Sequence, residues 1–358
     1  MARELASPAA RVHGGAVAAE LAALGLAVDE VLDLSVNVNP YGPAPSVVEA
    51  ARRAAFDRYP DPAASAVREA LAARWRRHAG EVLFAHGAAE LLWDLARHLA
   101  RARRCTLVVE PAFSELRAAI AACGGDAVEW RADPRRALEV DLAAVGQALA
   151  RTGAGALYLA APTSPAGAAV PAADVARLAR AHEQVLFVLD ESFLALSDRH
   201  ADAEVALPSN VVRLRSMTKE HAIPGLRAGY LLGPSALVAA LDAARPAWST
   251  SAPAQAAALA SLGEEAFVAE SRERLRDDRE ATRAGLARLG LAPLPSVAPY
   301  LVFEVRDAAV LRRRLLARRV LVRDCASFGL PAFVRVGARP APDRDRLLAA
   351  LAQELQIR

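Results

Sequence analysis

Hydrophobic positions between residues 88 and 232 fall into short apolar runs separated by amphipathic stretches. The runs ALYLA (156–160) and VLFVL (185–189) are apolar on both faces, which is typical of buried parallel strands. The pattern predicts strands at 105–109, 127–130, 156–160, 185–189, 211–214 and 228–232, and helices at 88–99, 114–122, 142–151 and 173–181. Alternation of this kind indicates an α/β fold, with a mostly parallel sheet covered by helices on both sides.

The two ends of the chain have a different pattern. Before the alternating region we expect one helix from Ser46 to Arg58 and another that begins at Asp61 and ends at Gly80. After it come long helical stretches at 253–263 and 264–289, then a strand at 300–305, a helix, short strands near Val320 and Val334, and a final helix. We therefore expect a large domain over 41–243, a smaller α+β domain over 244–358, and an N-terminal segment, 1–40, that joins the small domain.

Composition narrows the class of protein. With 24% charged and 54% hydrophobic residues the chain is typical of globular proteins. Its 44 basic and 41 acidic residues leave a net charge of +3, and no basic cluster alternates with aromatic residues, so we expect no nucleic-acid partner. Residues 152–173 are uncharged but contain three prolines, which argues against a membrane span. The three cysteines lie far apart and form no metal motif, which fits a reducing cytoplasm.

One basic residue is unlike the others. Lys219 is the single lysine of the chain, and the remaining 43 basic residues are arginine. Lysine can lose its proton and form an imine with a carbonyl group, whereas arginine does neither in a protein. A lysine present by chance on the surface would give the same composition. The neighbours of Lys219 must therefore decide between a chemical role and a chance surface position.

Polar residues follow several of the predicted strands. Asp190 ends the run VLFVL, the loop 161–167 follows ALYLA, and Lys219 lies just beyond the strand at 211–214. Each has an ordinary alternative, such as a helix cap or a plain loop. In open α/β sheets, however, ligands bind beyond the carboxyl ends of the strands. Together these residues predict a ligand site at one edge of the sheet.

Two motifs carry a resemblance to a known family. The stretch Arg215-Ser-Met-Thr-Lys-Glu-His-Ala-Ile-Pro-Gly-Leu-Arg-Ala-Gly-Tyr230 resembles the lysine loop of fold-type I pyridoxal-phosphate enzymes of the aminotransferase class I/II family. Asp190, in Val-Leu-Asp-Glu-Ser-Phe193, resembles the cofactor aspartate of that family. The resemblance covers nearly the whole chain. It implies the aspartate aminotransferase fold, with a large domain built on a mostly parallel sheet and a smaller α+β domain.

The resemblance assigns roles around the pyridoxal 5'-phosphate ring. Lys219 would hold the cofactor as an imine and later move protons at the substrate α-carbon. Asp190 would pair with the pyridine nitrogen and keep the ring protonated, so that the ring can accept electrons. Phe113, which follows the strand at 105–109, would stack on the ring face, although an aromatic residue of the core has the same pattern.

The family also has a defined site for the cofactor phosphate. The matching residues here are Gly87, Ala88 and Ala89 at the start of a predicted helix, where free backbone N–H groups and the helix dipole favour an anion. Ser216 and Arg227 would add a hydroxyl group and a guanidinium group. Tyr59 matches a tyrosine that reaches the phosphate of the partner subunit, which implies a homodimer with shared sites.

Two positions depart from the family pattern. Ser164 stands where the family usually has asparagine, and Phe193 stands where it often has tyrosine. Both family residues normally contact the phenolic oxygen of the cofactor. Ser164 stays a candidate cofactor contact, but the two changes leave room for a degenerate enzyme.

Further stretches resemble one branch of the family. These are His13-Gly-Gly15, the segment 33–42 and the segment 322–331, which look most like threonine-phosphate decarboxylases, next to histidinol-phosphate aminotransferases. Arg335 matches the family's carboxylate-binding arginine. His13, Arg323 and Asn37 are then candidate contacts for a phosphorylated substrate, although an exposed N-terminal histidine or a solvent-facing strand arginine would look the same.

Three functions stay open on the sequence. The first is decarboxylation of L-threonine O-3-phosphate for the aminopropanol side chain of cobalamin. The second is transamination of histidinol phosphate or another amino acid. The third is a non-catalytic protein that keeps the fold as a binding module, against which Lys219, Asp190 and Arg227 argue.

Overall fold

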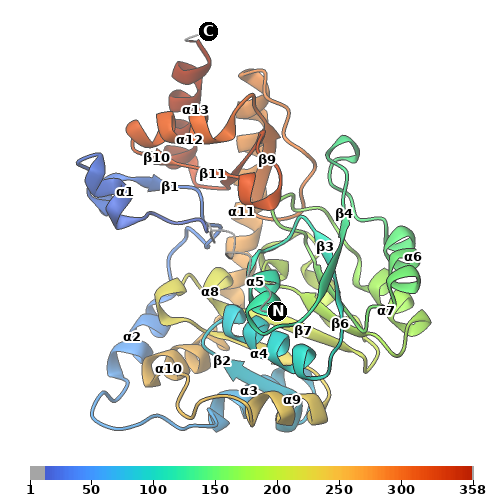
Figure 1. The fold of residues 1–358 in the computed structure, drawn as a ribbon. Helices are drawn as coiled ribbons and strands as arrows, with labels where there is room; N and C mark the ends of the chain where they lie inside the picture. Colours follow the sequence, from blue (N-terminus) through green and yellow to red (C-terminus); the bar gives the residue numbers. More distant parts are fainter. Residues whose placement is uncertain (1–12, 357–358) are drawn as a thin grey trace, which may run out of the picture.

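A seven-stranded sheet forms the centre of the larger part of the molecule. The computed structural model describes residues 13–356 (Figure 1). The strand order is β2-β8-β7-β6-β5-β3-β4, and β8 runs antiparallel to both of its neighbours while the other pairs are parallel. The predicted α/β fold with a mostly parallel sheet is confirmed. The strands are β2 (Val82–Ala85), β3 (Thr106–Glu110), β4 (Ala127–Arg131), β5 (Ala156–Ala160), β6 (Leu186–Asp190), β7 (Val211–Ser216) and β8 (Gly229–Leu232).

Helices cover both faces of this sheet. Val108 and Val188 point into a core shared with α4, α5 and α9, whereas Leu107, Leu157 and Phe187 point into a core shared with α6 and α7. Burial on both faces explains why these strands are apolar throughout. The helices of this part are α2 (Pro45–Arg53), α3 (Ser65–Trp75), α4 (Ala88–Arg101), α5 (Glu115–Ala122), α6 (Leu142–Thr152), α7 (Ala172–Ala181), α8 (Met217–Glu220), α9 (Ser235–Asp242) and α10 (Ala252–Ser261).

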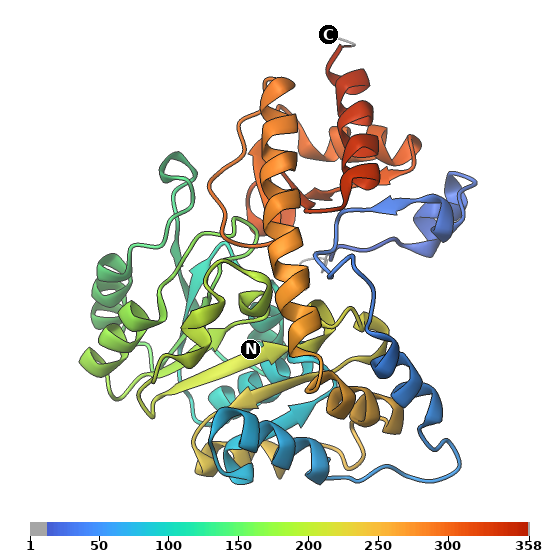
Figure 2. The ribbon, with the colours of Figure 1, turned by 180° about the vertical axis from the view of Figure 1, so that it is seen from behind.

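A second, smaller sheet lies in the C-terminal part of the chain. Its order is β11-β12-β9, all antiparallel, and α12 and α13 pack on it. Figure 2 shows the long helix α11 running from the larger part of the molecule to this smaller one. The elements are α11 (Glu265–Arg288), β9 (Tyr300–Glu304), α12 (Ala308–Ala317), β10 (Val320–Leu321), β11 (Arg323–Asp324), β12 (Phe333–Gly337) and α13 (Ala341–Gln356).

The N-terminal segment packs on the smaller part. Strand β1 (Leu32–Asp33) pairs in parallel with β10, and Leu21 of helix α1 (Ala18–Ala23) shares a core cluster with Leu316 and Leu321. Helix α10, which follows the domain boundary expected at residue 243, packs against α2, and its Ala257 joins a core cluster of the larger part. The division at residue 243 stays a prediction.

Some element ends differ from the sequence prediction for a local reason. The second helix begins at Ser65 instead of just after Asp61, because the Asp61 carboxylate accepts hydrogen bonds from the backbone N–H groups of Ala63 and Ser65 and forms a turn. Strand β2 and helix α9 were not predicted. Short 3₁₀ helices lie at Val28–Glu30, Ala79–Glu81, Pro134–Arg136, Leu194–Leu196, His200–Glu204, Pro224–Leu226 and Ala326–Phe328. Within residues 13–356, none of the helices combines the length and apolar character that a membrane crossing needs.

Candidate active site

A pocket of about 240 Å³ lies at the carboxyl ends of the parallel strands. Its walls come from the large sheet, from the N-terminal segment and from the small sheet. Most of the residues singled out in the sequence line it: His13, Asn37, Ala88, Ala89, Phe113, Ser164, Asp190, Ser216, Lys219, Arg227, Arg323 and Arg335. Phe193 lines it as well. The fold therefore brings together side chains that are more than 300 positions apart in the chain.

Lys219 lies on the short helix α8, directly after β7. Its side chain is partly buried, and its ammonium nitrogen lies 6.0 Å from the centre of the Phe193 ring. Burial, followed by the positive charges of Arg335 and Arg227, lowers the pKa of Lys219 to about 8. A lysine with a lowered pKa supplies a neutral amine near physiological pH, and the neutral amine is the nucleophilic form.

Asp190 ends β6 and is buried at the base of the pocket. Its Oδ2 accepts a hydrogen bond of 2.7 Å from the Tyr158 hydroxyl group, and its Oδ1 accepts one of 2.9 Å from the backbone N–H of Ser192. Burial, and then the Asp190 charge, raise the pKa of Tyr158 well above its ordinary value, so the phenol stays a donor. Two donors fix the orientation of this carboxylate, which is the type of group that pairs with a cationic ring nitrogen.

An anion-binding corner lies at the start of α4. Gly87 caps this helix with a φ of +82°, and a Cβ at Gly87 would come within 2.9 Å of Arg227 Nη2. Glycine therefore allows the guanidinium group to approach the helix start. A Cβ at Gly229 would lie 2.7 Å from the Ala88 nitrogen, so glycine is required there too. Free N–H groups of a helix first turn beside a guanidinium group form a site for a phosphate.

Hydroxyl groups extend this corner toward Lys219. Ser216 Oγ and Thr218 Oγ1 lie 2.7 Å apart and share a hydrogen bond, and both side chains line the pocket. Thr218 was not among the predicted site residues. Its signal in the sequence was its position next to Lys219, in the turn that follows a buried strand.

The opposite wall of the pocket carries two arginines from the small sheet. Arg323 on β11 and Arg335 on β12 are register partners in an antiparallel pair, and both are buried. Arg335 donates to Ser35 O at 2.9 Å and to Ser164 Oγ at 3.2 Å. Desolvation lowers the pKa of each guanidinium group, and the two charges oppose each other. Two converging cations in a buried wall favour a bound anion.

Unpaired polar atoms lie beside these arginines. The side-chain nitrogen and oxygen of Asn37, and Nε of Arg335, are buried without a hydrogen-bond partner in the described part of the chain. Both residues line the pocket. Buried polar groups are normally paired, so these atoms indicate where a polar ligand contacts the protein.

His13 and Phe113 lie at another side of the same pocket. Their ring centres are 5.3 Å apart, and His13 Nε2 lies 2.7 Å from Glu115 Oε1. The same Glu115 accepts a hydrogen bond of 2.9 Å from Trp93 Nε1. The His13 side chain is 41% exposed, whereas that of Glu115 is 10% exposed. His13 is therefore held against the start of α5 by a buried carboxylate.

Two predicted residues do not line the pocket. Gly87 lies just outside it as the helix cap described above. Tyr59 is 78% exposed and stacks on Trp248, with ring centres 4.6 Å apart. Tyr59 does not line the pocket of its own chain, and its predicted contact with the phosphate of a partner subunit stays a prediction.

Tyr158 and Tyr300 were missed by the sequence reasoning. Tyr158 was treated as one apolar position of a buried strand, and Tyr300 as the first residue of another. Tyr300 donates to Thr163 O at 2.8 Å and packs edge-on against Phe193 at 5.0 Å between ring centres. Because a buried tyrosine hydroxyl group needs a partner, a tyrosine within a buried strand was the available signal.

Comparison with known proteins identifies the family. The model of the family described as aminotransferase class I and II matches residues 29–353. A histidinol-phosphate aminotransferase of Symbiobacterium thermophilum is 34% identical over 336 residues, which is 92% of each chain. A threonine-phosphate decarboxylase of Salmonella typhimurium is 32% identical over 361 residues, or 96% of each chain. The structure of histidinol-phosphate aminotransferase from Sinorhizobium meliloti, solved with pyridoxal-5'-phosphate, is similar with a TM-score of 0.80, 28% identity and 90% of each chain covered. The chain belongs to the aminotransferase class I and II family.

Proposed function

We propose that this protein is a pyridoxal 5'-phosphate enzyme that decarboxylates L-threonine O-3-phosphate. The observation that carries the proposal is the division of one pocket into two ends. One end holds a lysine of lowered pKa, a buried carboxylate and a helix-start anion site, and the other holds two buried arginines. The first end fits the cofactor, and the second fits an anionic substrate.

The residues of the first end match the chemical groups of pyridoxal phosphate. Lys219 supplies the amine for its aldehyde, and Asp190 the anion for its ring nitrogen. The first turn of α4, with Arg227 and Ser216, supplies donors for its phosphate. When bound, the cofactor withdraws electrons from the substrate α-carbon, so that a bond at that carbon can break.

The protein's own groups then orient and protonate the substrate. Arg335, held by Ser35 O and Ser164 Oγ, binds the substrate carboxylate. Arg323, with Asn37 and His13, binds the substrate phosphate. Lys219, with its pKa near 8, exchanges between amine and ammonium near neutral pH and delivers a proton to the α-carbon.

The anionic subsites favour a substrate with two anionic groups. L-threonine O-3-phosphate carries a carboxylate and a phosphate in one molecule, which suits two buried guanidinium groups. Histidinol phosphate carries one anionic group. The likeness of the stretches at 13–15, 33–42 and 322–331 to threonine-phosphate decarboxylases supports the same choice.

Transamination of histidinol phosphate is the second candidate. The observation that favours it is the 34% identity with the Symbiobacterium thermophilum aminotransferase, against 32% with the decarboxylase. The two reactions differ in which bond of the substrate α-carbon would break. Loss of the carboxylate as carbon dioxide would give decarboxylation, whereas loss of a proton to Lys219 would lead to transamination.

One experiment separates these candidates. The absorbance spectrum of the purified protein is recorded before and after L-threonine O-3-phosphate is added, while carbon dioxide is measured. Carbon dioxide release with L-threonine O-3-phosphate, and far less with L-threonine, supports the decarboxylase. A spectral change without release, together with turnover of histidinol phosphate and 2-oxoglutarate, supports the aminotransferase. No cofactor absorbance after addition of pyridoxal phosphate would support a non-catalytic protein.

We also propose that the protein is a homodimer in which Tyr59 reaches the partner's cofactor site. Tyr59 and Trp248 form an exposed aromatic pair, and the nearby Phe56 is 82% exposed. Exposed aromatic clusters are typical of interfaces. Light scattering that gives the mass of one chain, 37.8 kDa, would contradict the dimer, and about twice that mass would support it.

A further inference from the structure

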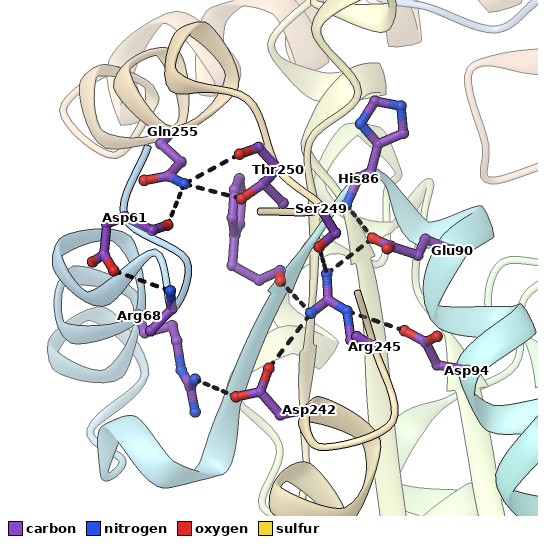
Figure 3. Close-up of polar contacts among 12 residues, drawn as sticks. Asp61, Arg68, His86, Glu90, Asp94, Asp242, Arg245, Ser249, Thr250 and Gln255 are labelled. Atoms are coloured by element: carbon purple, nitrogen blue, oxygen red, sulfur yellow. Dashed lines mark hydrogen bonds and ion pairs between the residues drawn. The ribbon is translucent and has the colours of Figure 1, made fainter. Parts of the chain in front are cut away.

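The first turn of α4 carries an acidic residue beside the anion site. Glu90 is the third residue of the helix, and its Oε2 accepts a hydrogen bond of 2.6 Å from the backbone N–H of His86 (Figure 3). The carboxylate thus closes the turn that contains Gly87. An uncompensated carboxylate this close to Ala88 and Ala89 would repel a phosphate.

The side chain of Arg245 compensates this charge. Arg245 follows α9, its side chain is 5% exposed, and its Nη2 lies 3.0 Å from Glu90 Oε2. Its Nε lies 3.4 Å from Asp94 Oδ2, one turn further along α4. The guanidinium group therefore binds two successive turns of the helix that begins at the anion site, as Figure 3 shows.

Arg245 also binds the chain on either side of the turn. Its Nη1 donates to Phe84 O in β2 at 2.8 Å, and its Nη2 donates to Ser249 Oγ at 2.6 Å. One planar side chain thus links the strand before the turn, the helix after it, and the loop that carries Trp248. The planar guanidinium group, with its several N–H donors arranged as a fork, fixes the relative position of the strand, the helix and the loop.

We propose that Arg245 is a positioning residue for the cofactor phosphate. It cancels the charge of Glu90 and holds the β2–α4 turn, so that the N–H groups of Ala88 and Ala89 face the phosphate. Arg245 itself does not line the pocket described above. The inference rests on the proposed function, namely that pyridoxal phosphate occupies this pocket.

Arg245→Gln tests the proposal, and Arg68→Gln is the matched control. Arg68 belongs to the same polar network through a 2.8 Å contact of its Nη1 with Asp242 Oδ2, but it does not contact Glu90 (Figure 3). We expect Arg245→Gln to release pyridoxal phosphate about tenfold faster than the wild type on dilution. A change of this size corresponds to the loss of one hydrogen bond to a charged group. The ³¹P resonance of the bound cofactor should also shift. Arg68→Gln should match the wild type in both.

Two further measurements separate a phosphate effect from general loss of structure. Pyridoxal, which lacks the phosphate, should bind the wild type and Arg245→Gln equally. Glu90→Gln combined with Arg245→Gln should recover part of the cofactor retention, because the uncompensated carboxylate is then gone. If Arg245→Gln fails to fold, Arg245→Lys keeps the charge without the fork and should show a smaller increase in release rate.

Several outcomes would overturn the inference. One is an unchanged release rate and an unchanged ³¹P resonance in Arg245→Gln, and another is an equal loss of affinity for pyridoxal and pyridoxal phosphate. A full recovery in Arg245→Lys would also do so, because the fork would then be unnecessary. A wild-type protein that binds no pyridoxal phosphate would instead overturn the proposed function itself.

Discussion

The two ends of the pocket are built in different ways. At the cofactor end, Asp190 and Lys219 follow neighbouring strands of one sheet, and the anion site begins the helix that follows β2. At the substrate end, Arg335 comes from the small sheet and is held by Ser35 of the N-terminal segment, 300 positions away in the chain. One end is built on the edge of a single sheet, and the other depends on how separate parts of the chain meet.

This difference predicts which properties each end controls. Changes at the cofactor end should alter cofactor binding or the chemical step, because under the proposed function those groups would touch the cofactor. Changes at the substrate end should alter the Michaelis constant and the choice of substrate while the cofactor stays bound. The following predictions test that separation in order of decreasing effect.

Replacement of Lys219 should have the largest effect. Lys219→Ala removes both the amine that holds the cofactor and the group that moves the proton, so turnover should fall by about 10³-fold or more. Steady-state kinetics measure the loss. The melting temperature of the cofactor-free protein should not fall, because Lys219 is a desolvated cation beside Arg335 and Arg227. A variant that keeps a tenth of the wild-type turnover would contradict the assignment.

The same lysine should make stability depend on pH. Its pKa is about 8 in the folded protein and near its ordinary value of 10.5 in the unfolded chain. Between these values the unfolded chain binds more protons, so the free energy of unfolding should rise with pH. Below pH 8, the free energy of unfolding of cofactor-free Lys219→Met should therefore exceed that of the cofactor-free wild type by at most about 3 kcal/mol. This difference should shrink toward pH 10.5. Urea unfolding at a series of pH values measures this; a constant difference would argue against it.

Replacement of Arg335 should affect substrate binding but not cofactor binding. Arg335→Lys keeps a positive charge but loses the planar fork, and its hydrogen bonds to Ser35 and Ser164 are disrupted. The Michaelis constant for L-threonine O-3-phosphate should rise by about 10- to 100-fold, the range for hydrogen bonds to charged groups. Cofactor retention, followed by absorbance after gel filtration, should stay unchanged. Loss of cofactor in this variant would mean that the two ends are not separate.

Tyr158 should have a smaller effect, at the cofactor end. Tyr158→Phe removes the 2.7 Å hydrogen bond to Asp190 but leaves the ring in the core. The turnover number should fall about tenfold with little change in the Michaelis constant, because one donor to a charged carboxylate is lost. The absorbance maximum of the bound cofactor should shift as well. If Tyr158→Phe and the wild type have equal kinetics and spectra, the backbone N–H of Ser192 alone is enough to hold Asp190.

The sequence predicted the cofactor end better than the network that supports it. Lys219 and Asp190 follow strands whose apolar runs are visible in the chain, so a rule about strand ends brings them together. The contact between Arg245 and Glu90 joins positions 155 residues apart and depends on the placement of β2 and α9, which the pattern did not predict. The Tyr158 contact depends on the exact register of β5 and β6, which apolar runs do not specify.

His13 should have the smallest effect and gives the finest test of the comparison. Its side chain is 41% exposed, so His13→Gln should raise the Michaelis constant for a phosphorylated substrate only about two- to fivefold, as for an exposed polar contact. The same variant should not change the Michaelis constant for the unphosphorylated analogue, because the carboxylate contact through Arg335 is intact. Glu115→Gln is the matched control, since it weakens the 2.7 Å contact that holds His13 without removing the imidazole ring. Equal changes for both substrates would mean that His13 closes the pocket instead of contacting the phosphate.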